Sequence, residues 1–150
     1  MKFPEIEAKN LENEPVNIPD HLHCALNVLI VAFKRWHQEL VDTWIPHLAR
    51  IKQGKDDFDF YELPTLGKIY SLGRFFIDGG MRTGIPSKQT RKHTITLYLD
   101  KDEFKKALHI QDESTIHLFL VKPDGNILWH GAGKYDRKTF EDLMLVMENN

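Results

Sequence analysis

The 150-residue sequence contains one cysteine, Cys24, and no apolar run near the roughly 18 residues that a membrane span needs. A lone cysteine excludes a disulfide within the chain and is typical of a reducing compartment. The formal net charge of -2 argues against a general nucleic-acid binder. Residues Met1 to Glu7 lack the hydrophobic core of a signal peptide, so we expect a cytoplasmic protein.

A strand followed at once by a helix organises the chain. Val28 to Phe33 is a short run of large and β-branched residues, which predicts a strand buried on both faces. The polar corner from Lys34 to His37 ends it, and apolar residues at helical spacing predict a helix from Leu40 to Ile51. Pro46 lies inside that helix and should kink it. The length suits one domain over residues 1–150.

The rest of the sequence predicts alternating strands and helices, separated by turns rich in Gly, Pro or charge. The expected segments are an edge hairpin within 3–19, strands at 58–64 and 94–99, helical stretches at 72–78 and 87–92, a helix from Asp100 that buries Phe104, Ala107 and Leu108, hairpin strands at 115–121 and 126–130, and a final helix at 138–147. The least regular part carries a broken apolar stripe at helical spacing. That stripe comprises Leu66, Ile69, Tyr70, Leu72, Phe75, Phe76 and Met81.

This order of elements resembles the thioredoxin superfamily. A buried strand, a short corner and a proline-kinked helix resemble the opening of the thioredoxin fold. The inserted strand and helix near residues 94–108 are similar to the branch that holds peroxiredoxins, TlpA-like proteins and Sco proteins. The resemblance implies an α/β fold with a central mixed sheet and flanking helices. It also implies a peroxiredoxin/TlpA-like insertion and a C-terminal hairpin followed by a helix.

The groups that carry thiol chemistry in that superfamily are missing. Thioredoxins place a Cys-x-x-Cys at the start of this helix, whose positive end lowers the thiol pKa. The spacing from Phe33 to Pro46 matches, but the two cysteine positions hold Gln38 and Val41. Thioredoxins also place a proline beside the thiolate, and its position falls here at about Ile116. Cys24 cannot replace the missing cysteines, because it lies before the first buried strand, at the other end of the sheet. The resemblance therefore implies a redox-inactive member, with a thiol-dependent oxidoreductase or peroxiredoxin-like enzyme as the alternative.

A closer resemblance lies in the last two thirds of the chain. The residues that carry it are 91–98, Phe104, 108–110, 119–121 and 124–133, with a Gly-x-hydrophobic-x-Trp-x-Gly-x-Gly pattern at 125–133. They resemble the Atp10 family, mitochondrial factors that assist assembly of the membrane sector of ATP synthase and that also lack the cysteine pair. The resemblance implies a non-catalytic assembly factor or interaction module with a protein partner and no cofactor. This sequence departs from the family in having no mitochondrial targeting segment.

The corner after the first strand is one candidate binding surface. It comprises Lys34, Arg35, Trp36, His37, Gln38 and Glu39. Ligands of α/β sheets bind at the carboxyl ends of strands, and helix N-termini attract anions. Trp36 lies at the edge of the buried stripe, so we expect it to be half exposed, as suits an anchor for a partner. The alternative is that Trp36 folds back onto the helix and the charges are only solvated.

A basic group in the irregular segment is a second candidate. Its members are Arg82, Lys88, Arg91, Lys92 and His93, which would bind an anionic ligand or an acidic partner unless they are ordinary loop charges. His21, His23 and Cys24 carry donor atoms for a soft metal, but nothing completes a closed site, so we expect no metal. A small-ligand or metal carrier is the third functional class. The sequence leaves the oligomeric state open.

Overall fold

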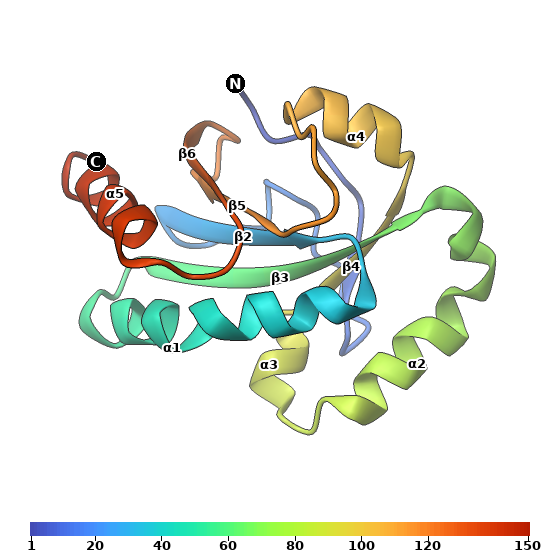
Figure 1. Ribbon diagram of the computed structural model, residues 1–150. Helices are drawn as coiled ribbons and strands as arrows, with labels where there is room; N and C mark the ends of the chain where they lie inside the picture. Colours follow the sequence, from blue (N-terminus) through green and yellow to red (C-terminus); the bar gives the residue numbers. More distant parts are fainter.

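The fold is built on one mixed sheet, shown in the computed structural model of Figure 1. The structure describes the backbone of residues 1–150 and every side chain except those of Ser71, Leu72, Arg74, Phe75 and Phe76. Its elements are β1 (Lys9–Asn10), β2 (Leu26–Ala32), η1 (Arg35–His37), α1 (Gln38–Gly54), β3 (Phe58–Gly67), η2 (Lys68–Gly73), α2 (Arg74–Gly84), α3 (Lys88–Lys92), β4 (Ile95–Leu99), α4 (Lys101–Ala107), β5 (His117–Val121), β6 (Ile127–Ala132) and α5 (Arg137–Glu148). The strand order is β1-β4-β3-β2-β5-β6.

Three neighbouring strands run parallel. β2 pairs with β3 from Leu26 opposite Phe58 to Ala32 opposite Pro64, and β3 pairs with β4 over Thr65–Gly67. β1, β5 and β6 each run antiparallel to their neighbours, which makes the sheet mixed, as predicted. Because parallel strands end at the same edge of a sheet, η1, η2 and α4 all begin at one edge.

Side chains that alternate along β2 build a core on each face of the sheet. Leu29 and Val31 pack with the N-terminal segment and α4, whereas Val28 and Ile30 pack with α1 and α5. In Figure 1 α4 and the start of the N-terminal segment lie above the sheet, and α1 lies below it. Trp44 of α1 is fully buried in the second core, so this helix is fixed to the sheet through a large aromatic side chain.

Most of the predicted elements are confirmed, with shifted ends. The first strand covers 26–32 rather than 28–33, and the helix expected at 72–78 is α2. The N-terminal hairpin consists of single bridges, Ile6 with Ile18 and Lys9 with Pro15, and Lys9 and Asn10 also pair with β4. Among the described residues, no helix is both long and apolar enough to cross a membrane.

The prediction that Ala107 is buried is wrong, and two residues of the apolar stripe are exposed. Ile69 and Tyr70 of the stripe are 76% and 55% exposed and lie in the 3-10 turn η2, through which the chain leaves β3. Ala107 is exposed, whereas Phe104 and Leu108, four positions apart on one side of α4, are buried. The side chains of Leu72, Phe75 and Phe76, which belong to the same predicted stripe, lie outside the described residues.

The glycines of the hairpin pattern have structural roles. Gly125 has a φ of 92° in the turn between β5 and β6, and its carbonyl accepts a bond from Phe3 N at 2.8 Å. A Cβ at Gly131 would collide with the indole ring of Trp129. Gly133 has a φ of 84°, and its carbonyl accepts a bond from Trp44 Nε1 at 2.9 Å. The pattern therefore fastens the hairpin to α1 and to the N-terminal segment.

Candidate functional site

A buried histidine closes the corner after β2. Phe33 N and Lys34 N both donate to His37 Nδ1, at 3.0 and 3.3 Å, and His37 N donates to Lys34 O at 3.0 Å. These bonds satisfy backbone N–H groups that the end of the strand would otherwise leave unpaired. The prediction that His37 lies on the exposed rim is wrong, since the residue is 0% exposed.

His37 is held as a neutral ring. Its Nδ1 accepts two bonds, so the proton of the neutral imidazole is assigned to Nε2, which has no hydrogen-bond partner among the described residues. Burial lowers the pKa of His37, and the nearby backbone of Ser114 opposes this only in part. The ring therefore supports the corner and does not serve as a charged group at neutral pH.

Trp36 projects from the corner that His37 supports. Its ring lies edge-on to the ring of His37, with centroids 4.5 Å apart, and the residue is 53% exposed, as predicted. Arg35 is exposed and makes no ion pair with any described side chain. Lys34 Nζ lies 3.7 Å from Glu113, a distance typical of a weak surface pair. The corner thus presents an aromatic ring beside a free guanidinium group.

The start of α1 carries an amide at the first of the two cysteine positions. Gln38 Nε2 donates to Asp42 Oδ1 at 2.9 Å and to Glu62 Oε1 at 3.1 Å. Val41 is 2% exposed and packs in the core, and Ile116, at the position expected for the thioredoxin proline, is fully buried. The helix N-terminus therefore faces a hydrogen-bonded amide and two carboxylates, and neither cysteine position offers a nucleophile.

Two apolar side chains that we did not predict to belong to a site lie at the same edge of the sheet as the corner. Ile69 and Tyr70 lie in η2, and Figure 1 shows η2 and the start of α1 at the same end of the sheet. Glu39 is exposed near this edge as well. Gly67 and Lys68 break the apolar stripe just before Ile69, which was a signal for an exposed turn.

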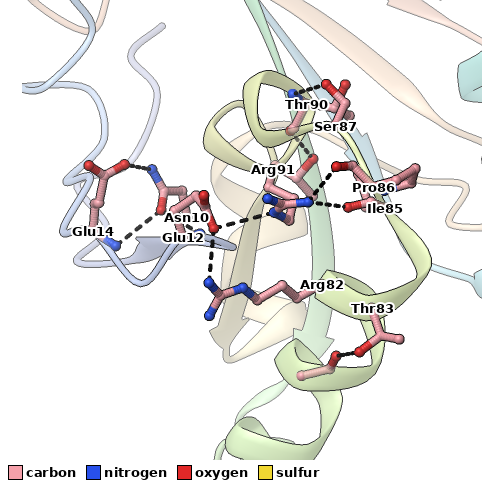
Figure 2. A network of polar contacts seen from close by, with 12 residues as sticks. Asn10, Glu12, Glu14, Arg82, Thr83, Ile85, Pro86, Ser87, Thr90 and Arg91 are labelled. Carbon is pink, nitrogen blue, oxygen red and sulfur yellow. Dashed lines mark hydrogen bonds and ion pairs between the residues drawn. The ribbon is translucent and has the colours of Figure 1, made fainter.

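The second predicted basic group is largely engaged in internal contacts. Figure 2 shows Arg82 and Arg91 converging on Glu12, each with a nitrogen 3.3 Å from Glu12 Oε2. Arg91 Nη1 also donates to the carbonyls of Ile85 and Pro86, at 2.7 and 2.8 Å. The hydrogen bond from Arg91 holds the pKa of Glu12 below its ordinary value. These two arginines are therefore paired with Glu12 and are not free, and binding of an anion by the predicted basic group stays a prediction.

His93 from the same predicted group is also bound internally. Its Nε2 lies 2.8 Å from Asp59 Oδ2 and its Nδ1 lies 2.8 Å from the carbonyl of Gln89. Lys52 Nζ approaches the other oxygen of Asp59 at 2.9 Å. Burial acts to raise the pKa of Asp59, but the bonds from His93 and Lys52 outweigh it and the pKa is lowered. Lys92 makes no ion pair among the described side chains.

A groove of about 460 Å³ runs over β3 between α1 and α3. It exists because β4 pairs with β3 chiefly from Thr65 onward, which leaves the first part of β3 uncovered on that side. Its apolar lining comes from Ile45, Ala49 and Phe60, and its carboxylates are Asp59 and Glu62. Burial raises the pKa of Glu62. No local pattern in the sequence indicates this groove, because its walls come from three separate segments.

The cluster of His21, His23 and Cys24 does not form a ready metal site. His21 Nδ1 accepts a hydrogen bond from Asn17 N at 2.9 Å. No group of three His, Cys, Asp or Glu side chains suited to a metal ion occurs among the described residues. Burial, followed by the nearby Asp59, raises the pKa of the Cys24 thiol, so the thiolate is disfavoured there.

The sequence profile of the ATP10 protein family matches residues 1–149. No curated protein matches the chain. The structure resembles the exposed lipoprotein thioredoxin Etrx1 of Streptococcus pneumoniae, with a TM-score of 0.61 and 12% identity over 97% of this chain and 99% of that one. It also resembles BsSco, a member of the Sco family of cytochrome c oxidase assembly proteins, with a TM-score of 0.59 and 14% identity over 98% and 92% of the two chains.

A third similar structure is a thiol:disulfide interchange protein from a Bacteroides species, with a TM-score of 0.59 and 17% identity over 99% of this chain and 89% of that one. At such low identity these similarities establish the fold, which is thioredoxin-like, as predicted. They establish no activity for this chain. The profile match accounts for the hairpin pattern and extends the resemblance over the first third of the sequence, where the residues alone indicated only the fold.

Proposed function

Because the chain belongs to the ATP10 protein family, we propose that it is an assembly factor that binds a protein client and performs no thiol–disulfide exchange. The client that we propose is a subunit of the membrane sector of ATP synthase, the role that the family resemblance implies. In this proposal the thioredoxin-like fold serves as a scaffold. The corner that carries redox chemistry in thioredoxins serves here as a contact surface.

The proposal rests on the residues that occupy the two cysteine positions at the start of α1. A helix N-terminus lowers the pKa of a thiol placed on it, but Gln38 and Val41 occupy the cysteine positions, one bound to carboxylates and the other buried. Cys24 precedes β2, at the opposite end of that strand, and the pKa of its thiol is raised. These features support a protein that has kept the fold and lost the reaction.

The exposed groups at the same edge support a contact surface for a client. Trp36, Ile69 and Tyr70 place large apolar side chains in water at the ends of two adjacent parallel strands, next to Arg35 and Lys68. Aromatic and arginine side chains contribute most of the binding free energy in many protein interfaces. His37 fixes the backbone beneath Trp36, so the anchor is preorganised.

Client binding can be tested by capture from solubilised membranes of the native cell, with the purified chain as bait and antibodies against ATP synthase membrane-sector subunits. The combined variant Trp36→Ala/Arg35→Glu should lose capture while its Tm stays within about 2 °C, because both side chains are exposed. Leu145→Ala is the matched control, since Leu145 is 57% exposed on α5, away from the corner. Full capture by a folded double variant would contradict the corner as the contact surface.

The absence of redox chemistry is tested with insulin-disulfide reduction and peroxide turnover. We expect the wild-type chain to stay at the background rate in both assays, since neither cysteine position carries a thiol. Cys24→Ser is the control for the remaining thiol. A rate well above background that disappears in Cys24→Ser would support the alternative, a thiol-dependent enzyme.

We also propose that the chain works in the cytoplasm. The lone, partly buried thiol of Cys24 suits a reducing compartment, where no disulfide is needed. Fractionation of the native cell, with detection by an antibody to the chain, should recover it with cytoplasmic markers. Recovery inside an organelle would contradict this location without affecting the proposed client.

A further inference from the structure

The groove between α1 and α3 has an apolar floor and an unbalanced charge at one end. Phe60 of β3 forms the floor, and Ile45 and Ala49 of α1 form one wall. Its volume of about 460 Å³ lies within the range of small-molecule sites. A groove of this size that combines apolar walls with a few polar groups is a typical binding site for a small ligand.

The unbalanced charge is that of Glu62. One of its oxygens, Oε1, accepts a bond from Gln38 Nε2 at 3.1 Å, and Oε2 has no partner among the described side chains. No described cation forms an ion pair with Glu62, and the neighbouring carboxylate of Asp42 adds further negative charge. Burial, and after it Asp42, accordingly raises the pKa of Glu62. A carboxylate in this position gains from any cation that can reach it.

The cations at the other end of the groove are already engaged. Lys52 Nζ lies 2.9 Å from Asp59 Oδ1, and His93 Nε2 lies 2.8 Å from Asp59 Oδ2. Asp59 already partners both groups, so an anionic ligand would gain less from them than from a free cation. A neutral apolar ligand would leave Glu62 unpaired in a less hydrated groove, at a cost in free energy. A cationic ligand pairs with Glu62 and leaves the Lys52–Asp59–His93 contacts intact.

We propose that this groove binds a small organic monocation, whose charged group pairs with Glu62 and whose apolar body lies on Phe60 between Ile45 and Ala49. The groove touches the corner only through the bond from Gln38 to Glu62, and its walls do not include Trp36 or Arg35, so the two proposals can be tested separately. The cation should carry a planar or compact apolar body, because the groove is lined by one aromatic ring and short or branched aliphatic side chains.

Benzamidine is a suitable probe, with the uncharged amide benzamide as its matched control. Titration of the ¹⁵N-labelled full-length chain should shift the backbone amide signals of Ala49, Phe60 and Glu62. A ligand of this size should bind with a Kd on the order of 1 mM. Benzamide should bind at least about tenfold more weakly, since it cannot pair with the carboxylate. Equal binding of the two probes, or no shift of these signals, would overturn the proposal.

Two variants locate the site. Glu62→Gln should weaken benzamidine binding at least about tenfold, whereas Glu7→Gln, the same change at an exposed residue of the N-terminal segment, should have no effect. Ala49→Phe should block the groove while the helix is retained, which circular dichroism would verify. Unchanged binding by either folded variant would overturn the proposal.

Two further measurements separate this site from the client surface. Trp36→Ala/Arg35→Glu should bind benzamidine like the wild type, and its loss of binding would overturn the separate site. Benzamidine affinity should fall as the pH drops from 7 toward 4, because the Glu62 carboxylate takes up a proton above its ordinary pKa of 4.5. Affinity that stays constant over this range would overturn pairing with Glu62.

Discussion

Two regions rich in basic residues have opposite roles in this fold. The corner at residues 34–39 keeps Arg35 and Trp36 at the surface, with Trp36 53% exposed. In the segment at residues 82–93, Arg82 and Arg91 converge on Glu12, as Figure 2 shows. The first region leaves Arg35 and Trp36 exposed at the surface, whereas the arginines of the second hold the N-terminal segment against α2 and α3.

The two regions differ in their ion pairs because different segments of the chain lie next to them. The segment at 82–93 lies beside the N-terminal segment and β3, which supply carboxylates 79 and 34 positions away in the sequence. The corner projects from the edge of the sheet. Among the described side chains, its one ion pair joins Lys34 to Glu113 at 3.7 Å, and Glu113 lies closer to Lys105, at 2.7 Å. Arg35 therefore stays free among the described side chains, whereas Arg82 and Arg91 are paired with Glu12.

The largest loss of stability should come from a substitution that weakens the packing of α1, the helix that follows the corner. Trp44→Ala should lower the free energy of unfolding by about 3 to 5 kcal/mol, because Trp44 is fully buried and its indole donates to Gly133 O. Urea denaturation measures this, with the exposed Trp36→Ala as the control, for which the loss should stay below about 1 kcal/mol. Similar losses of unfolding free energy in the two variants would contradict the assignment of Trp44 to the core and of Trp36 to the surface.

The fold was largely predictable because its signals are local. The buried run in β2, the helical spacing of Val41, Trp44 and Leu48, and the hairpin turn at Gly125 each lie within a few residues of sequence. The exposure of Ile69 and Tyr70 could not be predicted, because helical spacing alone does not show whether another element covers the stripe. In η2 none does.

The candidate site was less predictable, because its properties depend on distant segments. Trp36 lies at the end of an amphipathic stripe, so its exposure followed from local spacing. The burial of His37 depends on its ring turning back to accept bonds from Phe33 N and Lys34 N, which composition does not reveal. The pairing of Arg91 with Glu12 joins segments that no local pattern relates.

The next largest effect should come from removing the support of the corner. His37→Ala should cost about 2 to 3 kcal/mol, because it leaves a buried gap and two backbone N–H groups without an acceptor. Faster hydrogen exchange at Phe33 and Lys34 should accompany the loss. Glu39→Ala, an exposed neighbour, is the control. Unchanged exchange in a less stable His37→Ala protein would mean that the ring fills space without fixing the corner.

The same residue predicts a dependence of stability on pH. The pKa of His37 is lowered in the folded protein, so its contribution is fully present above the ordinary value of 6.5 and is lost as the pH falls through the folded value. The wild type should therefore lose stability relative to a His37→Gln variant as the pH drops from 7 to 5. Parallel curves for the two proteins would show that His37 is protonated equally easily in the folded and unfolded chains.

The two regions can be compared directly with one substitution at two sites. Arg91→Met should lower the Tm by roughly 5 °C, because Arg91 joins Glu12 to the carbonyls of Ile85 and Pro86. Arg35→Met should change the Tm by less than about 1 °C, because Arg35 is exposed. Differential scanning calorimetry measures both. Equal shifts would mean that the two basic regions do not differ in role.

The smallest change in stability is expected from a substitution of Glu62, and this substitution should stabilise the protein. The pKa of Glu62 is raised by burial, so its ionised form opposes folding: the contribution of Glu62 is most favourable below 4.5 and is lost as the pH rises through the folded pKa. Glu62→Gln should therefore raise the Tm at pH 7 by roughly 1 to 3 °C, and the gain should vanish near pH 4, where the wild-type carboxyl is also neutral. The new side-chain amide keeps an oxygen that can accept the bond from Gln38 Nε2, so packing is unchanged. Glu7→Gln should give no gain at either pH. A gain that persists at pH 4 would trace the effect to packing instead of charge, and would remove the reason for expecting a cation in the groove.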